Sequence, residues 1–233
     1  MALDLKRHLF FDLDRTLWDF DSNSKETLAS IVVEFKLEEH FGISFDPFYK
    51  YYEKINRSYW AKYAAGEIER ESLRVDRFYN TLRSFGLENE NLAKQISTYY
   101  LGECPKKKNL IPNALSVLDS LAKDFPLHII TNGFTATQKI KLKESGLQDY
   151  FQNMVTSDMA NAQKPSSKIF EMAWNLAGSP DKENCFYIGD DWNADVRGAK
   201  QFGFTPIWFS TEYRKTRVKQ VSDLNDIIPL VRE

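Results

Sequence analysis

The chain has 233 residues, of which 42% are hydrophobic and 14% aromatic, so it can bury a large core and does not resemble a disordered protein. Its formal net charge of −2 leaves no basic surplus, and we expect no nucleic-acid partner. Two cysteines and three histidines are too few for a disulfide framework or a zinc site, and no apolar run suits a signal peptide or a membrane span, so we expect a cytoplasmic protein without a membrane partner.

The first predicted element is a buried strand over residues 8–13, in which an apolar run from His8 to Phe11 ends in the two acidic residues Asp12 and Asp14. Alternate residues of a strand face the same side, so the two carboxylates would crowd together where the strand becomes a loop. Like charges this close are costly unless a cation lies between them or one of them stays protonated. Asp-x-Asp also occurs by chance in solvated turns, so this pair alone does not separate a site from a loop.

Residues 20–102 show only helical spacing of apolar residues, in four stretches. Asn23 and Glu26 resemble a capping box at the start of the first stretch. We therefore predict a four-helix insertion over 20–102, inside a core built from residues 1–19 and 103–233.

The second helix of this insertion is predicted to start at Asp46-Pro47 and to end at Gly66. It has more aromatic residues than one buried face can hold, so some of them must line a surface or a cleft. These residues are Tyr49, Tyr51, Tyr52, Tyr59, Trp60 and Tyr63.

From Cys104-Pro105 onward, helices and strands alternate. Alternating βα units predict a parallel sheet with helices on both faces, and hence an α/β fold with a Rossmann-like core. The predicted strands are 127–130, 154–156, 185–188 and 206–209, and the predicted helices are 113–123, 135–145, 167–177 and one more before the last strand.

Polar residues follow the predicted strands at four places. Each group alone is an ordinary turn or loop, but the carboxyl ends of parallel strands meet at one edge of the sheet, where ligands bind. Their occurrence in order, each after a strand, predicts one shared site. The groups are Asp12 with Asp14, Thr131 with Asn132, Lys164, and Asp190 with Asp195.

This collection suits phosphoryl transfer. Several carboxylates need a hard divalent cation, and oxygen ligands favour Mg²⁺. Mg²⁺ and Lys164 would neutralise a phosphate, to which the Thr131 hydroxyl can donate a hydrogen bond. Asp12 can attack phosphorus to give an aspartyl phosphate, while Asp14 protonates the leaving oxygen and then deprotonates the attacking water.

The same motifs resemble the haloacid dehalogenase-like (HAD) hydrolase superfamily over essentially the whole chain. The resemblance implies a Rossmann-like core with an inserted helical cap, and Mg²⁺-dependent hydrolysis of a small phosphomonoester through an aspartyl phosphate. The matching residues are Asp12-x-Asp14-x-Thr16, Thr131, Lys164, and Gly189-Asp190 with Asp195 five residues after Asp190.

The resemblance also implies individual roles. Asp12 would be nucleophile and metal ligand, and Asp14 the acid/base whose backbone carbonyl also binds the metal. Asp190 would be a further metal ligand, with Asp195 supporting the metal's water shell. The phosphate would be held by Thr131 and Lys164, with Asn132 close by.

Finer similarity, over 129–135, 146–151 and 164–170, is to the branch of cytosolic nucleoside 5′-monophosphatases that act mainly on pyrimidine nucleotides. The chain departs from the superfamily at Arg15, which stands where glycine is usual and which we expect to face solvent. Asp191 adds an acid beside the proposed ligand, which is therefore assigned by its position in the motif.

Three other functions compete with a nucleotidase. A 2-haloacid dehalogenase would need neither Asp14 nor the acids around Asp190. A phosphatase or mutase for another small phosphoester, such as a sugar phosphate, would share the same core and differ in its cap and products. A non-catalytic phosphate-binding module would not need the intact set of Asp12, Asp14, Lys164 and Asp190.

Overall fold

The computed structural model describes residues 6–233. The first five residues, part of the segment expected to lack a signal peptide, lie outside the described residues. The chain divides into two compact units. The helical unit is Asp21–Lys107, and the sheet unit comprises the chain up to Phe20 together with Lys108–Glu233.

The sheet unit contains one six-stranded sheet in the order β3-β2-β1-β4-β5-β6, and every pair of neighbouring strands is parallel. The predicted α/β fold with a Rossmann-like core is therefore confirmed. The last strand is short and was not predicted. The strands are β1 His8–Phe11, β2 Leu127–Thr131, β3 Phe151–Thr156, β4 Cys185–Gly189, β5 Thr205–Phe209 and β6 Lys219–Val221.

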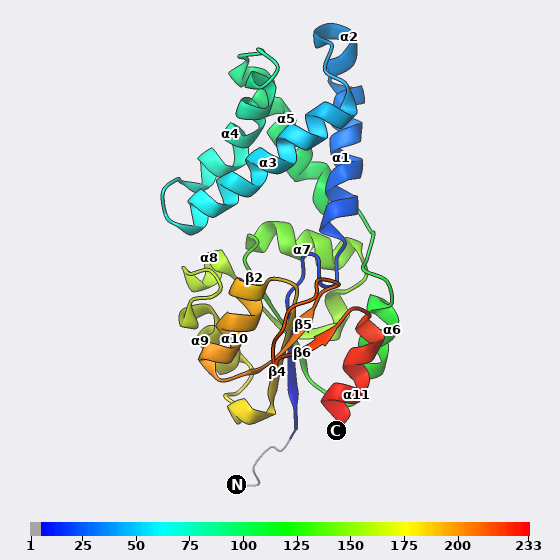
Figure 1. Ribbon diagram of the computed structural model, residues 1–233, viewed down its shortest axis with the longest axis vertical. Helices are drawn as coiled ribbons and strands as arrows, with labels where there is room; N and C mark the ends of the chain where they lie inside the picture. Colours follow the sequence, from blue (N-terminus) through cyan, green and yellow to red (C-terminus); the bar gives the residue numbers. More distant parts are fainter. Residues whose placement is uncertain (1–5) are drawn as a thin grey trace. The chain divides into compact units, whose positions relative to one another are not determined.

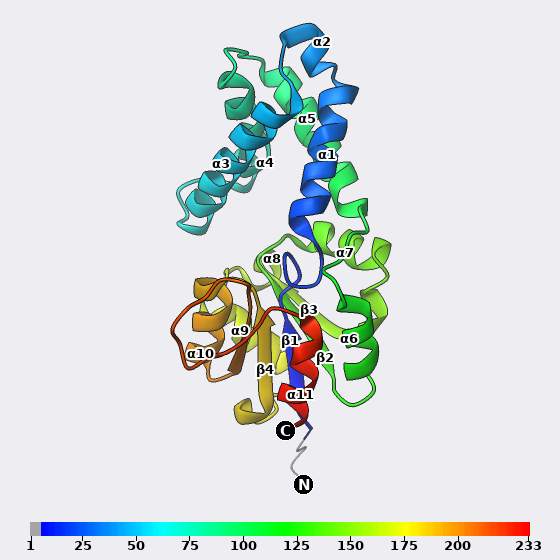
Figure 2. The ribbon, with the colours of Figure 1, turned by 45° about the vertical axis from the view of Figure 1, so that its right-hand side comes forward.

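Helices cover both faces of this sheet: α9 and α10 lie on one side, and α6 and α11 on the other (Figures 1 and 2). Under α9 and α10 the core is aromatic, with the ring of Phe10 stacked on Phe204 at 4.8 Å between centroids. The helices of this unit are α6 Ala114–Leu121, α7 Thr135–Glu144, α8 Ser157–Ala160, α9 Ser167–Leu176, a π-helix Trp192–Arg197, α10 Gly198–Phe202 and α11 Ile227–Arg232.

The strand order explains where a ligand can bind. The chain passes from β1 to β2 and β3 on one side, and then crosses to β4 on the other side of β1. A crevice forms at such a switch point, beyond the carboxyl ends of the strands. The residues that follow β1, β2 and β4 are therefore neighbours, although those after β1 lie more than a hundred residues from the other two groups in sequence.

The helical unit contains one helix more than predicted, because the five-residue α2 was too short to show a period. Residues with left-handed backbones flank it, Lys36 at φ 47° and Gly42 at φ 66°. The predicted capping box was wrong, since α1 begins at Phe20 and Asn23 is buried inside it. The helices are α1 Phe20–Glu34, α2 Leu37–Phe41, α3 Phe45–Ala64, α4 Arg70–Arg83 and α5 Glu90–Glu103, with a 3-10 turn Cys104–Lys106 beyond the predicted boundary.

A buried cation stands at the centre of the helical unit. The guanidinium of Arg77 lies 5.1 to 5.8 Å from the ring centroids of Tyr52, Phe78 and Tyr100, and donates to Asn56 at 2.8 Å. Of the aromatic excess on α3, Tyr52 is buried and the others are partly or largely exposed, as predicted. No helix among residues 6–233 combines the length and apolarity needed to cross a membrane.

Candidate active site

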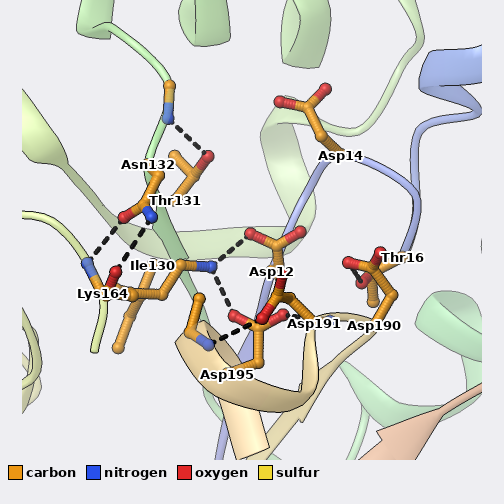
Figure 3. Close-up of polar contacts among 12 residues, drawn as sticks. Asp12, Asp14, Thr16, Ile130, Thr131, Asn132, Lys164, Asp190, Asp191 and Asp195 are labelled. Atoms are coloured by element: carbon orange, nitrogen blue, oxygen red, sulfur yellow. Dashed lines mark hydrogen bonds and ion pairs between the residues drawn. The ribbon is translucent and has the colours of Figure 1, made fainter. Parts of the chain in front are cut away.

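Asp12 is the first residue after β1, and its carboxylate is buried against Lys164. The two charged atoms, Lys164 Nζ and Asp12 Oδ1, lie 2.5 Å apart, and both side chains are less than a tenth exposed (Figure 3). Asp12 is placed by the sheet itself, since its backbone N–H donates to the carbonyl of Ile188 in the neighbouring strand β4. The predicted meeting of these remote segments therefore takes place.

Lys164 uses all three of its ammonium hydrogens within the protein. Besides Asp12, Nζ donates to Asp195 Oδ1 at 2.7 Å and to the Tyr187 hydroxyl at 2.8 Å. The Tyr187 hydroxyl also lies 3.0 Å from Asp195 Oδ1 and 3.1 Å from the carbonyl of Ile130. Lys164 thus joins Asp12 after β1 to Tyr187 in β4 and to Asp195 on the helix after β4. Its predicted contact with phosphate needs one of these hydrogen bonds to be shared.

The loop after β4 carries two acids, Asp190 and Asp191, which have different partners. Asp190 receives a 3.5 Å hydrogen bond from Thr16, and its backbone carbonyl accepts the Trp208 indole N–H at 2.8 Å. Asp191 instead caps the π-helix, because its Oδ1 accepts two backbone N–H groups of that helix. The geometry therefore puts Asp190 in the site and gives Asp191 a structural partner.

Asp195 is buried on the first turn of that π-helix and faces back toward β4. Its Oδ2 accepts the Asp191 backbone N–H at 2.9 Å, while Oδ1 meets Lys164. Gly189 makes this approach feasible, since a Cβ there would lie 2.4 Å from Asp195 Oδ2. A real Cβ cannot come so close to a neighbouring atom, so this position requires glycine.

The electrostatics of the cluster show a shortage of positive charge. Burial raises the pKa of Asp12 well above its usual range; Lys164 opposes this shift, and the carboxylates of Asp195 and Asp190 add to it. Burial also raises the pKa of Asp190 from 3.8 to about 7, with repulsion from Asp195 as the next cause. Burial disfavours the charged form of Lys164, but attraction to Asp12 and Asp195 outweighs it and raises the pKa of Lys164.

The donor set fits a magnesium ion. One oxygen from each of Asp12, Asp190 and Asp195 lies within 4.8 Å of the other two. Three carboxylates exceed the single ammonium of Lys164, and a divalent cation would offset the difference. Carboxylate oxygens are hard ligands of the kind that Mg²⁺ takes. The Asp14 side chain is not part of this group, and the proposed contact through its backbone carbonyl stays a prediction.

The carboxylate of Asp14 points away from the other acids (Figure 3) and is held by α7. Lys141 Nζ lies 2.5 Å from Asp14 Oδ1, and Gln138 Nε2 lies 2.9 Å from Asp14 Oδ2. Neither Gln138 nor Lys141 was predicted as a site residue. The sequence held one signal: two polar residues three apart share a face of the helix that follows a polar strand end.

Thr131 and Asn132, at the end of β2, have different environments. The Thr131 hydroxyl is buried and accepts hydrogen bonds from Gly133 N–H at 3.1 Å and from Gln138 at 2.6 Å. Asn132 uses its side-chain amide on Lys164, accepting the Lys164 N–H at 2.7 Å and donating to its carbonyl at 3.2 Å. Asn132 therefore fixes the loop that carries Lys164. Because its side-chain amide is used there, the predicted contact of Asn132 with phosphate would have to come from its backbone.

Arg15 is exposed, as expected, but its head group does not simply project into solvent. The guanidinium carbon lies 4.5 Å from the centroid of Phe20, and its charge lowers the pKa of Asp190 against the effect of burial. The backbone of Arg15 is left-handed, with φ 67°. Glycine adopts this conformation without cost, which explains why glycine is usual here in the superfamily that the motifs resemble.

Comparisons with known proteins agree with the fold. The family described as haloacid dehalogenase-like hydrolase matches residues 6–203. Pyrimidine 5′-nucleotidase YjjG of Escherichia coli is 29% identical over 209 residues, covering 89% of this chain and 87% of that protein. Pyrimidine 5′-nucleotidase PynA of Streptococcus pneumoniae is 30% identical over 209 residues, covering 89% and 85%.

A solved structure shows the same fold over the whole chain. The putative HAD-hydrolase YfnB of Bacillus subtilis, whose crystal structure is described as bound to magnesium, matches with a TM-score of 0.88. The alignment covers 98% of this chain and 99% of that one, at 23% sequence identity.

Proposed function

Because the chain belongs to the haloacid dehalogenase-like hydrolase family, we propose that it is a Mg²⁺-dependent phosphatase of nucleoside 5′-monophosphates, with pyrimidine nucleotides preferred. The family match and two nucleotidase relatives of about 30% identity support a phosphatase of this family. One observation carries the proposed Mg²⁺-dependent phosphatase chemistry: the carboxylates of Asp12, Asp190 and Asp195 meet near Lys164 at the switch point of the sheet.

In the proposed reaction, Asp12 attacks phosphorus while the bond from phosphorus to the ester oxygen breaks. Asp14 gives its proton to the departing oxygen, which leaves as an alcohol. Water then attacks the phosphorus of the aspartyl phosphate and gives a proton back to Asp14, while the bond from phosphorus to the Asp12 oxygen breaks and frees the Asp12 carboxylate. The products are the nucleoside and inorganic phosphate, and both aspartates return to their starting states.

The other residues bind and orient. The Thr131 hydroxyl and the backbone N–H groups at the end of β2 would donate to the phosphate oxygens. Lys164 would hold Asp12 in line for attack, and Asn132 would hold Lys164. Magnesium would be bound by Asp12, Asp190 and the carbonyl of Asp14, with Asp195 supporting its water shell. When bound, it neutralises the phosphate dianion beside these acids.

Two features support a nucleotide substrate. The relatives YjjG and PynA are named as pyrimidine 5′-nucleotidases. The helical unit also has partly exposed aromatic rings on α3, including Tyr51, which is 43% exposed. Such rings offer a flat apolar face on which a base can stack. The names of the two relatives, rather than the rings, are the reason to expect pyrimidine monophosphates to be the better substrates, because such rings would stack a purine as well.

The decisive experiment is phosphate release from a panel of phosphomonoesters, with Mg²⁺ and with a chelator. The panel contains pyrimidine and purine 5′-monophosphates and sugar phosphates, and 2-haloacids are tested in parallel for halide release. We expect pyrimidine monophosphates to give the highest kcat/KM, only with Mg²⁺. Preference for sugar phosphates would overturn the nucleotidase proposal, and halide release that survives chelation would overturn the phosphatase mechanism.

A further inference from the structure

Two residues of α7, Gln138 and Lys141, are buried although their neighbours Lys139, Ile140 and Lys143 are exposed. Burying an ammonium and an amide is costly unless both find partners. Their positions are three apart, so they lie on the same face of the helix. Their hydrogen-bond partners, Asp14 and Thr131, explain the burial. Both partners have roles in the proposed reaction.

Together the two residues hold both oxygens of Asp14. Lys141 Nζ contacts Oδ1 at 2.5 Å, and Gln138 Nε2 donates to Oδ2 at 2.9 Å. The ring of Trp18 lies 4.3 Å from Lys141 Nζ and keeps the ammonium in place through a cation–π contact. With a donor at each oxygen, the Asp14 carboxylate has a defined rotation, although its side chain is 23% exposed.

Gln138 also determines what Thr131 can do. Its Nε2 donates a second hydrogen bond, of 2.6 Å, to the Thr131 hydroxyl, which accepts another from Gly133 N–H. A hydroxyl has two lone pairs and one hydrogen, so with both lone pairs occupied Thr131 can only donate. Its hydrogen is then directed at whatever acceptor lies beyond β2, which is the role that a phosphate oxygen needs.

The orientation of the Gln138 amide follows from its surroundings. Turning the amide over would place its carbonyl oxygen against the Asp14 carboxylate, which has no hydrogen to donate when ionised. The carbonyl oxygen, Oε1, is buried without a hydrogen-bond partner among the described residues. The fold therefore accepts the free-energy cost of an unpaired buried oxygen in order to keep the amino group facing Asp14 and Thr131. Gly133 leaves room for it, since a Cβ there would lie 2.3 Å from Nε2.

We propose that Gln138 and Lys141 are positioning residues that aim the acid/base Asp14 at the leaving oxygen, and that Gln138 also fixes Thr131 as a donor to the phosphate. The inference rests on the proposed function, in which Asp14 protonates the leaving group. An alkoxide leaving group needs that proton as its bond to phosphorus breaks, whereas 4-nitrophenolate is stable as an anion and leaves without it. Misorientation of Asp14 should therefore lower kcat/KM only for alkyl phosphates.

The test compares kcat/KM for the best alkyl phosphate of the panel with kcat/KM for 4-nitrophenyl phosphate. Lys141→Met should lower the first about 10²-fold and the second less than about 10-fold. Lys141→Arg, which keeps a cation at Asp14 Oδ1, should restore most of the loss. Lys139→Met, the same change on the exposed face of α7, should leave both values unchanged.

Gln138→Met separates the two roles of the amide. It should show the same selective loss and, in addition, should weaken competitive inhibition by inorganic phosphate about 5- to 10-fold, because Thr131 is no longer held as a donor. Lys141→Met should leave phosphate inhibition within about 2-fold of wild type, since Thr131 keeps both of its hydrogen bonds.

Thermal unfolding of each variant checks the fold, and Lys141→Gln replaces Lys141→Met if the latter does not fold. Equal losses on the two substrates, or an equal loss in Lys139→Met, would overturn this inference and leave the proposed function standing. A wild-type protein that releases no phosphate from any ester with Mg²⁺ would overturn the proposed function and this inference with it.

Discussion

The two ends of the central strands bury polar groups in opposite ways. At the amino end, His8 and His128 face each other with ring nitrogens 3.2 Å apart, and Asn153 lies 3.2 Å from the other nitrogen of His128. At the carboxyl end, Asp12 and its neighbours crowd around Lys164. In the first group both ring nitrogens of His128 have hydrogen-bond partners within the protein, while the second group holds more negative charge than the protein offsets.

Burial is the largest cause of the pKa shifts at both ends, but the consequences for stability have opposite signs. It lowers the pKa of His128 from 6.5 to about 4, so the unfolded chain takes up a proton first as the pH falls, and stability is lost. It raises the pKa of Asp190 to about 7, so in a chelated sample the folded chain takes up a proton first, and stability is gained on acidification. The carboxyl end therefore carries unfavourable repulsion among its carboxylates, which a bound cation can relieve.

The largest effect is expected from Asp12→Asn. Without an attacking carboxylate the aspartyl phosphate cannot form, and turnover of the best panel substrate should fall by at least about 10³-fold. Because the neutral amide relieves repulsion among the acids, the melting temperature in chelator should not fall below that of wild type. Wild-type turnover in this variant would assign the nucleophile elsewhere, and a large drop in melting temperature would deny that the acids repel each other.

Lys164→Met tests the balance of charge at the carboxyl end. It leaves Asp12, Asp190 and Asp195 without their internal cation, and removing one partner of a buried ion pair costs about 3–5 kcal/mol. Urea unfolding at pH 7.5 in chelator should show this loss, and Mg²⁺ should recover part of it. The exposed Lys168→Met on α9 is the matched control. A loss below about 1 kcal/mol would mean that the acids do not depend on Lys164.

Adding magnesium should stabilise the wild-type protein by about 2.7 kcal/mol at 100 times its dissociation constant, because the ion binds only the folded chain. Asp190→Asn removes one ligand and should abolish most of this gain, while the exposed Asp149→Asn should retain it. Unfolding curves with and without Mg²⁺ measure both. An unchanged gain in Asp190→Asn would remove that residue from the metal site.

The smallest effect belongs to the amino end. A pKa lowered from 6.5 to about 4 should cost the wild-type protein about 2 kcal/mol between pH 7 and pH 5, through His128 alone. The glutamine of His128→Gln cannot titrate. Between pH 7 and pH 5 the free energy of unfolding of this variant should therefore fall by about 2 kcal/mol less than that of the wild type. Urea unfolding at several pH values, with both proteins in the same buffers, isolates the difference. Identical pH profiles would show that His128 is not the group that titrates.

The sequence was sufficient for the sheet and for the gathering of the acids, because both follow from strands that end in polar residues. Apolar runs located β1 to β5, although the first predicted strand extended past Phe11 and the third covered only 154–156. The parallel topology then brought Asp12, Lys164 and Asp190 to one edge. Such long-range placement is predictable because few connections are allowed between parallel strands.

The parts that were missed depend on contacts rather than on patterns. The π-helix cap formed by Asp191 and the hold of Asn132 on Lys164 are visible only once the loops are folded. Gln138 and Lys141 lie in a helix whose sequence shows an ordinary mixture of polar and apolar residues. Short elements such as α2 and β6 carry too few residues to establish a period.

The hydrogen bond from the Trp208 indole to the Asp190 carbonyl has a practical consequence. The same indole meets the ring of Trp192 edge-on at 5.0 Å, with the guanidinium of Arg214 over both rings. Indole emission changes with the polarity and hydrogen bonding around the ring, so a ligand that pulls on this loop alters the fluorescence of the protein. We expect Mg²⁺ binding to change this emission, so that titration of the unlabelled protein with Mg²⁺ would measure the affinity without any substrate.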